Sequence, residues 1–218
     1  MPGGPSISGE RVVVVGAGAL GCAVLPRLAR MRIGSLVIVD GDRVEAANLG
    51  RQPLYEDMDI GFPKATTAAG WMRQIIATGT ADGVDAFVDD GNAEHLLRGA
   101  DLVVEGVDDL HAKHLIDRTC GTLGIPLVSG GVHQHQGQVI VLHATGEGST
   151  LHRNDLFNGR AGAAQDGCDM RQVPIDLLEE VGKVMAARAR AILRGEPVTN
   201  GAIELWSGSN WISLAPPR

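Results

Sequence analysis

The chain has 218 residues, enough for one α/β domain with a small appendage. Apolar residues make up 44% of it and charged residues 21%, which excludes a disordered or low-complexity chain. The formal net charge is −7, so neither nucleic acid nor an anionic membrane surface is expected as the main partner.

The cysteines indicate the cellular compartment. Cys22, Cys120 and Cys168 are odd in number and widely spaced, so they support neither a disulfide framework nor a zinc site of cysteine pairs. The longest uncharged stretch, Val12 to Pro26, is shorter than the ~18–20 residues of a membrane-spanning helix and contains three glycines. We therefore expect a cytoplasmic protein with no membrane segment.

Strands and helices alternate along the chain. Residues 1–10 are expected to form a flexible arm, and residues 11–218 a single domain. Strands are predicted at Val12–Val15, Ser35–Asp40, Asp85–Val88, Asp101–Val104, Pro126–Ser129 and Val139–His143. Helices are predicted at Leu20–Met31, His111–Leu123 and Pro174–Arg194, and a terminal hairpin at Ala202–Trp206 and Trp211–Leu214. This order predicts an α/β fold: a Rossmann-like, doubly wound, mostly parallel sheet with a C-terminal hairpin.

The alternation stops between Ala144 and Val173. This stretch of about 30 residues is polar and rich in glycine. A run of that length without periodicity in a compact domain is usually a functional loop, so we expect a long mobile crossover loop there.

A glycine motif follows the first predicted strand. Gly16, Gly18 and Gly21 fit the pattern G-x-G-x-x-G between a strand and a helix. Glycines let backbone amides approach phosphates, and the helix N-terminus adds positive potential. Asp40 ends the second strand, where a carboxylate can accept hydrogen bonds from ribose hydroxyls. These features predict an adenine-nucleotide site without separating NAD from ATP.

Polar residues past the second and fourth strands favour ATP. Asn48, Arg51, Gln52 and Lys64 follow the second strand, and a triphosphate needs cations when charge moves onto pyrophosphate. Asp108 follows the fourth strand, where a carboxylate can hold Mg²⁺. Taken singly, each charge could be an ordinary surface residue on a loop. Their order at the ends of strands favours a site.

The motifs GAGALG, DGD, NLGRQ and VDD, with Lys64 between the last two, resemble the E1-like adenylating family, which includes ThiF, MoeB, HesA and the adenylation domains of ubiquitin-activating enzymes. The resemblance covers roughly Arg11 to His143. It implies that ATP and Mg²⁺ adenylate the C-terminal glycine of a ubiquitin-like β-grasp protein. An E2-like protein or a sulfurtransferase would then be a further partner.

The resemblance also implies roles for single residues. Asp40 matches the ribose-binding aspartate and lies in the DGD motif with Asp42. The phosphate-handling set is matched by Asn48, Arg51, Gln52 and Lys64. Asp108 matches the aspartate on the Mg²⁺ side. The catalytic residues expected are thus Arg51, Lys64 and Asp108, together with the cysteine described below.

The chain departs from the family in two respects. Members commonly carry two Cys-x-x-Cys pairs for a structural zinc, whereas the matching stretch here, His152 to Phe157, keeps only the final Leu-Phe. We therefore expect no such zinc and a looser loop. Members also tend to begin with a helix whose Arg reaches into the ATP site of the neighbouring subunit. Here only the short arm precedes the first strand, so the resemblance supports a homodimer less firmly than in the family.

Cys168 is the candidate acceptor thiol. It lies in the long loop, where the family often has its thioester or persulfide cysteine. Asp166 and Asp169 flank it and disfavour the thiolate, so an adventitious thiol is the alternative. Cys22 and Cys120 are expected to be small core residues on helices.

Two histidines are further candidates for metal ligands. His133 and His135 could face one side of a strand, but they lack a third ligand and predict no metal site.

The leading interpretation is adenylation followed by thioester formation or sulfur transfer, in a bacterial ubiquitin-like conjugation or sulfur-carrier pathway. One alternative is an NAD-dependent oxidoreductase, against which Arg51, Lys64 and Asp108 argue. Another is a non-catalytic E1-like binding partner, which would not need these three residues.

Overall fold

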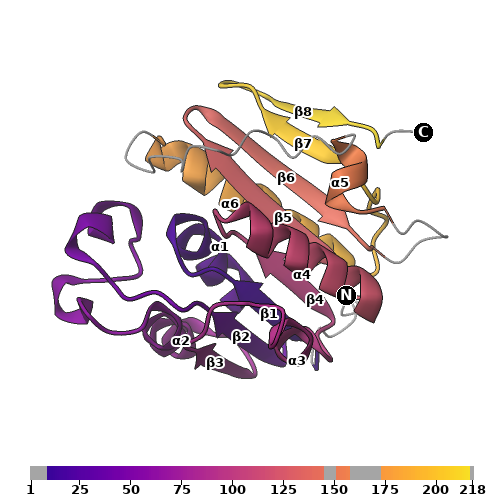
Figure 1. Ribbon diagram of the computed structural model, residues 1–218. Coiled ribbons are helices and arrows are strands. Elements are labelled where there is room, and N and C mark those ends of the chain that lie inside the picture. Colours follow the sequence, from indigo (N-terminus) through magenta and orange to yellow (C-terminus); the bar gives the residue numbers. More distant parts are fainter. Residues whose placement is uncertain (1–8, 145–150, 158–172, 217–218) are drawn as a thin grey trace, which may run out of the picture.

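The computed structural model describes residues 9–144, 151–157 and 173–216 (Figure 1). Cys168, most of the crossover loop and nearly all of the N-terminal arm lie outside the described residues. The strands of the described chain are β1 (Arg11–Val15), β2 (Ser35–Val39), β3 (Thr80–Val84), β4 (Leu102–Glu105), β5 (Leu127–His133), β6 (Gln136–Leu142), β7 (Ile203–Trp206) and β8 (Trp211–Leu214). The helices are α1 (Ala19–Ala29), α2 (Lys64–Ile75), α3 (Ala93–Leu97), α4 (Leu110–Leu123), α5 (Arg153–Leu156) and α6 (Ile175–Leu193), with 3₁₀ turns η1 (Ala46–Arg51) and η2 (Asp57–Asp59).

These strands form one sheet in the order β3-β2-β1-β4-β5-β6-β7-β8. The first five strands in this order, β3, β2, β1, β4 and β5, are parallel to one another. Strands β6, β7 and β8 are antiparallel to their neighbours. The Rossmann-like, mostly parallel sheet and its C-terminal hairpin are therefore confirmed. Val15 pairs with Val39 on one side and Glu105 on the other, so the carboxyl ends of β1, β2 and β4 meet at one edge.

Alternate residues of the strands enter two separate cores. Val12 and Val14 pack with buried residues of α1, α2 and α6, while Val13 and Val15 pack with those of α3 and α4. Figure 1 shows α4 and α6 on opposite faces of the sheet. A strand covered on both faces can be apolar at every position, which explains the run of four valines in β1.

The third predicted strand was wrong. We expected Asp85–Val88, whereas β3 spans Thr80–Val84 and the side chain of Phe87 is exposed. At the edge of the sheet, β3 needs only one strand partner, so its sequence TADGV carries little strand signal. Gly83 has a structural reason to be there: a Cβ atom would lie 2.4 Å from the carbonyl oxygen of Ala65.

Helix α2 was absent from the sequence interpretation, although its pattern indicates it. Ala65, Ala68, Ala69 and Met72 are buried at the spacing i, i+3, i+4, i+7 of one helix face. The helix begins at Lys64, directly after Pro63. Its start therefore places a lysine at the edge of the sheet where the glycine motif lies.

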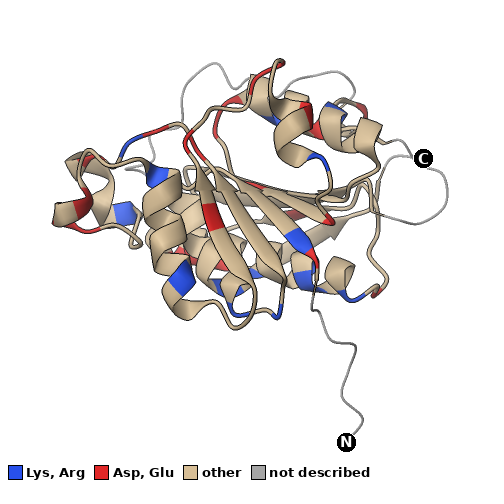
Figure 2. Cartoon of the chain, turned by 90° about the horizontal axis from the view of Figure 1, so that it is seen from below, with Lys and Arg blue, Asp and Glu red and all other residues tan. Residues whose placement is uncertain are grey.

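Charged residues lie mostly on the helices and connecting segments around the sheet, as Figure 2 shows. None of the described helices is long and apolar enough to cross a bilayer. The segment between β2 and α2 extends away from the sheet in Figure 1 and carries several of the predicted site residues.

Candidate nucleotide site

The glycine motif forms a tight turn between β1 and α1. Gly16 has a φ of +97°, which L side chains rarely adopt, and its N–H donates to the carbonyl of Val39 at 2.9 Å. A Cβ atom on Gly21 would lie 2.3 Å from the carbonyl oxygen of Gly16. The close packing of turn and helix thus requires glycine at both positions.

Asp40 joins this turn to the end of β2. Its two carboxylate oxygens accept the backbone N–H groups of Ala17 at 2.6 Å and of Asp42 at 2.8 Å. Burial raises the pKa of the Asp40 carboxyl, against the lowering effect of these two donors. Each oxygen keeps a second lone pair, so the carboxylate can also accept hydrogen bonds from a ribose. The Tyr55 hydroxyl donates to the carbonyl of Ala17 at 2.7 Å and fixes the turn from the other side.

Lys64 and Asp42 form an ion pair beside Asp40. Lys64 Nζ lies 3.0 Å from Asp42 Oδ2, and the Lys64 N–H donates to the Asp42 carbonyl at 2.9 Å. The Lys64 side chain is 6% exposed and the Asp42 side chain 55%. The buried aliphatic part of the Lys64 side chain holds its ammonium group at the carboxyl end of β2.

Gln52 and Arg51 lie on the segment after β2. A Cβ atom on Gly18 would lie 4.0 Å from Gln52 Nε2, so this buried carboxamide lies beside the glycine turn. Gln52 Oε1 is buried without a hydrogen-bond partner among the described residues. Arg51 donates from Nη1 to the carbonyl of Val173, just before α6. Asn48 is half-buried in η1.

Asp108 lies on the loop after β4, and the start of this loop packs on the glycine turn. The N–H of Gly106 donates to the carbonyl of Val15 at 3.0 Å. A Cβ atom on Gly16 would lie 3.2 Å from the carbonyl carbon of Gly106. Asp108 itself is exposed two residues further along. Asp108 thus follows, by two residues, a backbone segment that packs on the turn, and its side chain is exposed.

The described residues fit ATP and Mg²⁺. The turn leaves no room for a side chain at Gly21, and the buried Gln52 carboxamide beside it has unused hydrogen-bonding capacity. Asp42 and Asp108 supply exposed oxygen ligands of the kind that Mg²⁺ prefers.

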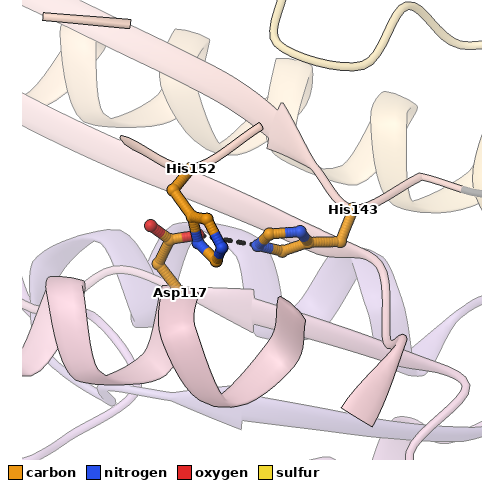
Figure 3. A group of neighbouring side chains, drawn as sticks. All are labelled: Asp117, His143 and His152. Carbon is orange, nitrogen blue, oxygen red and sulfur yellow. Dashed lines mark hydrogen bonds and ion pairs between the residues drawn. The ribbon is translucent and has the colours of Figure 1, made fainter. Parts of the chain in front are cut away.

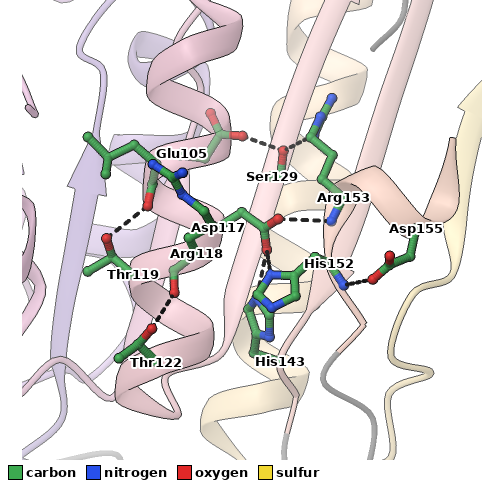
Figure 4. Close-up of polar contacts among 11 residues, drawn as sticks. Glu105, Asp117, Arg118, Thr119, Thr122, Ser129, His143, His152, Arg153 and Asp155 are labelled. Carbon is green, nitrogen blue, oxygen red and sulfur yellow. Dashed lines mark hydrogen bonds and ion pairs between the residues drawn. The ribbon is translucent and has the colours of Figure 1, made fainter. Parts of the chain in front are cut away.

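A buried polar network behind this site was missed by the sequence interpretation. Lys113 Nζ lies 2.9 Å from both carboxylate oxygens of Glu105 and donates to the carbonyl of Gly130 at 2.7 Å. Ser129 Oγ donates to Glu105 and accepts from Arg153 Nη1 at 2.9 Å (Figure 4). Burial lowers the pKa of Lys113, although the Glu105 carboxylate opposes the shift. The signal for this network was Glu105 directly after the apolar run Leu102–Val104, because a buried charge needs a partner.

The stretch His152 to Phe157 belongs to the region in which we expected a looser loop, most of which lies outside the described residues. It contains the short helix α5, and Arg153 is buried. The Arg153 backbone N–H donates to Asp117 Oδ2 at 2.9 Å. Side-chain anchoring, which residue composition does not reveal, explains the order of this segment.

Cys22 and Cys120 are buried core residues, as expected. Burial raises the pKa of both thiols, that of Cys22 to about 12.

Comparison with known proteins agrees with this geometry. The ThiF family model matches residues 3–211. The chain is 41% identical over 133 residues to the SAMP-activating enzyme E1 of Haloferax volcanii, covering 61% of this chain and 49% of that protein. It is 36% identical to the sulfur carrier protein adenylyltransferase of Thermus thermophilus, covering 84% of this chain and 69% of that protein. It is 30% identical to the molybdopterin-synthase adenylyltransferase of Escherichia coli, covering 88% and 76%.

Solved structures share the fold. E. coli MccB with ATP has a TM-score of 0.74 at 19% identity, covering 96% of this chain and 64% of that one. PaaA has a TM-score of 0.75 at 20% identity, covering 94% and 62%. The family match over nearly the whole chain, the relatives and the shared fold lead to one conclusion: this chain belongs to the ThiF family.

Proposed function

We propose that the chain uses ATP and Mg²⁺ to adenylate the C-terminal glycine of a ubiquitin-like β-grasp protein. The observation that carries this proposal is the family match over residues 3–211, on a chain whose turn, Asp40 and Lys64 converge at one edge of the sheet. The names of the relatives refer to a sulfur carrier protein, to SAMP and to molybdopterin synthase, which support a small carrier protein as substrate.

In the proposed reaction, a carboxylate oxygen of the glycine attacks the α-phosphorus of ATP. The bond from that phosphorus to the bridging oxygen breaks, and pyrophosphate leaves with the electron pair. Both reactants are anionic, so repulsion between them is a large part of the barrier. Lys64 and Arg51 supply positive charge. The turn of Gly16, Gly18 and Gly21 leads into the N-terminus of α1, whose first backbone N–H groups donate to the phosphates, with Asn48 and Gln52 beside them. Mg²⁺ held by Asp108 would neutralise charge on the leaving pyrophosphate.

A second step follows from the same proposal. The thiolate of Cys168 attacks the acyl carbon, the bond to AMP breaks, and a thioester results. If the product instead receives sulfur, a sulfurtransferase is the next partner, whereas conjugation needs an E2-like protein. Cys168 lies outside the described residues, so its support is its place in the sequence, between α5 and α6. We place the reaction in the bacterial cytoplasm and leave a homodimer open.

The experiment is ATP–pyrophosphate exchange with a small β-grasp protein as the candidate substrate. We expect exchange only when that protein ends in glycine, and a dithiothreitol-sensitive adduct on a non-reducing gel that Cys168→Ala abolishes. An adduct that persists in Cys168→Ala would assign the second step to another thiol. ATP binding without exchange would favour the non-catalytic E1-like partner, and NAD bound more tightly than ATP would favour the oxidoreductase.

A further inference from the structure

Three side chains from separate elements converge outside the nucleotide site. Asp117 comes from the middle of α4, His143 directly follows β6, and His152 precedes α5 (Figure 3). Asp117 Oδ1 lies 2.7 Å from His143 Nε2 and 3.2 Å from His152 Nδ1. One atom of each residue lies within 4.8 Å of the other two. Two imidazole nitrogens thus face a single carboxylate oxygen.

Two locally unfavourable backbone features accompany the close approach of the two imidazole rings. His143 has a φ of +55°, in the left-handed region that costs a non-glycine residue about 1 kcal/mol or more. Gly121 lies inside α4, where glycine costs ~0.5–1 kcal/mol relative to alanine. A Cβ atom on Gly121 would lie 2.7 Å from His152 Cε1 and 2.9 Å from His143 Cε1. The glycine therefore opens the space that both imidazoles fill.

The surroundings orient the carboxylate as a second shell does around a metal. The Arg153 backbone N–H donates to Asp117 Oδ2 at 2.9 Å, and Asp117 Oδ1 is directed at the two histidines. The side chains of Asp117 and His143 are 3% and 4% exposed, while that of His152 is 35% exposed. Solvent therefore reaches the cluster from the His152 side.

We propose that Asp117, His143 and His152 bind a divalent transition-metal ion, Zn²⁺ by preference, with water in the remaining position. Two imidazoles and a carboxylate are typical zinc ligands. With bonds of ~2.1 Å, tetrahedral ligand atoms stand ~3.4 Å apart. The Asp117–His152 pair at 3.2 Å is close to this separation, whereas His143 Nε2, at 2.7 Å from Asp117 Oδ1, has to move back by about 0.7 Å. This site is distinct from the cysteine zinc site that the chain lacks, and it does not depend on the proposed function.

Such an ion would take the place of the ring protons between the two nitrogens and Asp117 Oδ1, and each proton would then reside on the other nitrogen of its imidazole. It would fasten residues 151–157 to α4 and to the end of β6. The same contacts without an ion form a hydrogen-bonded cluster, so the measurement has to separate these two states.

The test uses the full chain carrying Cys168→Ser, so that this thiol does not contribute a ligand. After treatment with EDTA and gel filtration, the protein is titrated with Zn²⁺ in competition with a chromophoric chelator, and with Co²⁺ while visible absorption is recorded. We expect one Zn²⁺ per chain and Co²⁺ bands typical of four-coordination. His152→Ala should weaken Zn²⁺ binding by at least ~10–100-fold, the scale for disturbing a metal site.

The matched control is His133→Ala, which removes a histidine outside the cluster and should bind Zn²⁺ like the parent. His152 is chosen because it is the most exposed of the three residues, and thermal unfolding without metal verifies that the variant folds. Zn²⁺ should raise the Tm of the parent and of His133→Ala but not that of His152→Ala. Failure of the parent to bind one Zn²⁺, or equal binding by His152→Ala and His133→Ala, would overturn the proposal.

Discussion

Replacing Gly21 by alanine tests whether the glycine turn is built as closely as the structure indicates. The added Cβ atom would lie 2.3 Å from the carbonyl oxygen of Gly16 and 3.0 Å from its carbonyl carbon. Both atoms are backbone, so rotation of a side chain does not relieve the clash. The start of α1 has to move away from the turn.

The magnitude follows from two opposing effects. Overpacking of this kind costs ~1–3 kcal/mol. Gly21 lies within α1, so alanine regains ~0.5–1 kcal/mol of helix preference. We expect a net loss of roughly 1–2 kcal/mol, which lowers the Tm of a domain this size by about 2–8 °C. Displacing the backbone donors by about an ångström should also lower ATP–pyrophosphate exchange by ~100-fold.

The matched control is Gly70→Ala. Gly70 lies in α2, and its Cβ atom would meet nothing within 4 Å, so alanine should stabilise the protein by ~0.5–1 kcal/mol and leave exchange unchanged. Urea denaturation measures the stability of both variants, and exchange of labelled pyrophosphate measures their activity. If Gly21→Ala is as stable and as active as Gly70→Ala, the steric argument for the turn fails.

Three further predictions concern charge and thiol reactivity. Asp108→Ala should lower pyrophosphate exchange by at least ~100-fold with a smaller effect on ATP affinity in calorimetry; near-normal exchange would remove Asp108 from the mechanism. Lys64→Met should lower exchange while changing the free energy of unfolding by less than ~1 kcal/mol, because its partner carboxylate is half exposed; undiminished exchange would contradict a role at the phosphates. Cys22 and Cys120 should not react with Ellman's reagent at pH 8 until urea unfolds the chain, since burial raises the pKa of both thiols, that of Cys22 to about 12, and leaves them protonated. Any reaction of native Cys168→Ser would show that one of them is accessible.

The candidate nucleotide site at the carboxyl ends of β1 and β2 was predictable, because the sequence motifs that indicate it are local. The valine run of β1 ends in the glycine turn, and Asp40 follows β2 directly, so the parallel register alone brings them together. Asp40 therefore accepts from Ala17 as a neighbour across two adjacent strand ends. The edge strand β3 could not be predicted in this way, because its position is set by pairing with β2 and not by the strand preference of its own residues.

The Asp117 cluster was not predictable from spacing. His143 lies 26 residues and His152 lies 35 residues from Asp117, and no motif joins these positions. They meet because α4 packs beside β5 and because β6 returns antiparallel to β5, which carries His143 back along the helix. Ligands that depend on such packing leave no periodic trace in the sequence.

Arg153 connects the two sites physically. Its backbone N–H holds Asp117 Oδ2, and its guanidinium donates to Ser129, which in turn donates to Glu105 (Figure 4). Glu105 Oε2 also accepts the N–H of Val107 at 3.2 Å, one residue before Asp108. A continuous series of buried polar contacts therefore runs from the proposed metal site to the loop at the nucleotide edge. Removing one partner from such a buried network typically costs ~3–5 kcal/mol, because the remaining charge is left unpaired. The position of α5 and the position of the Asp108 loop are thus linked by one series of hydrogen bonds. A change that detaches α5 removes the Arg153 donor from Ser129 and leaves the Glu105–Lys113 ion pair in place, whereas replacing Lys113 or Glu105 alone incurs that cost.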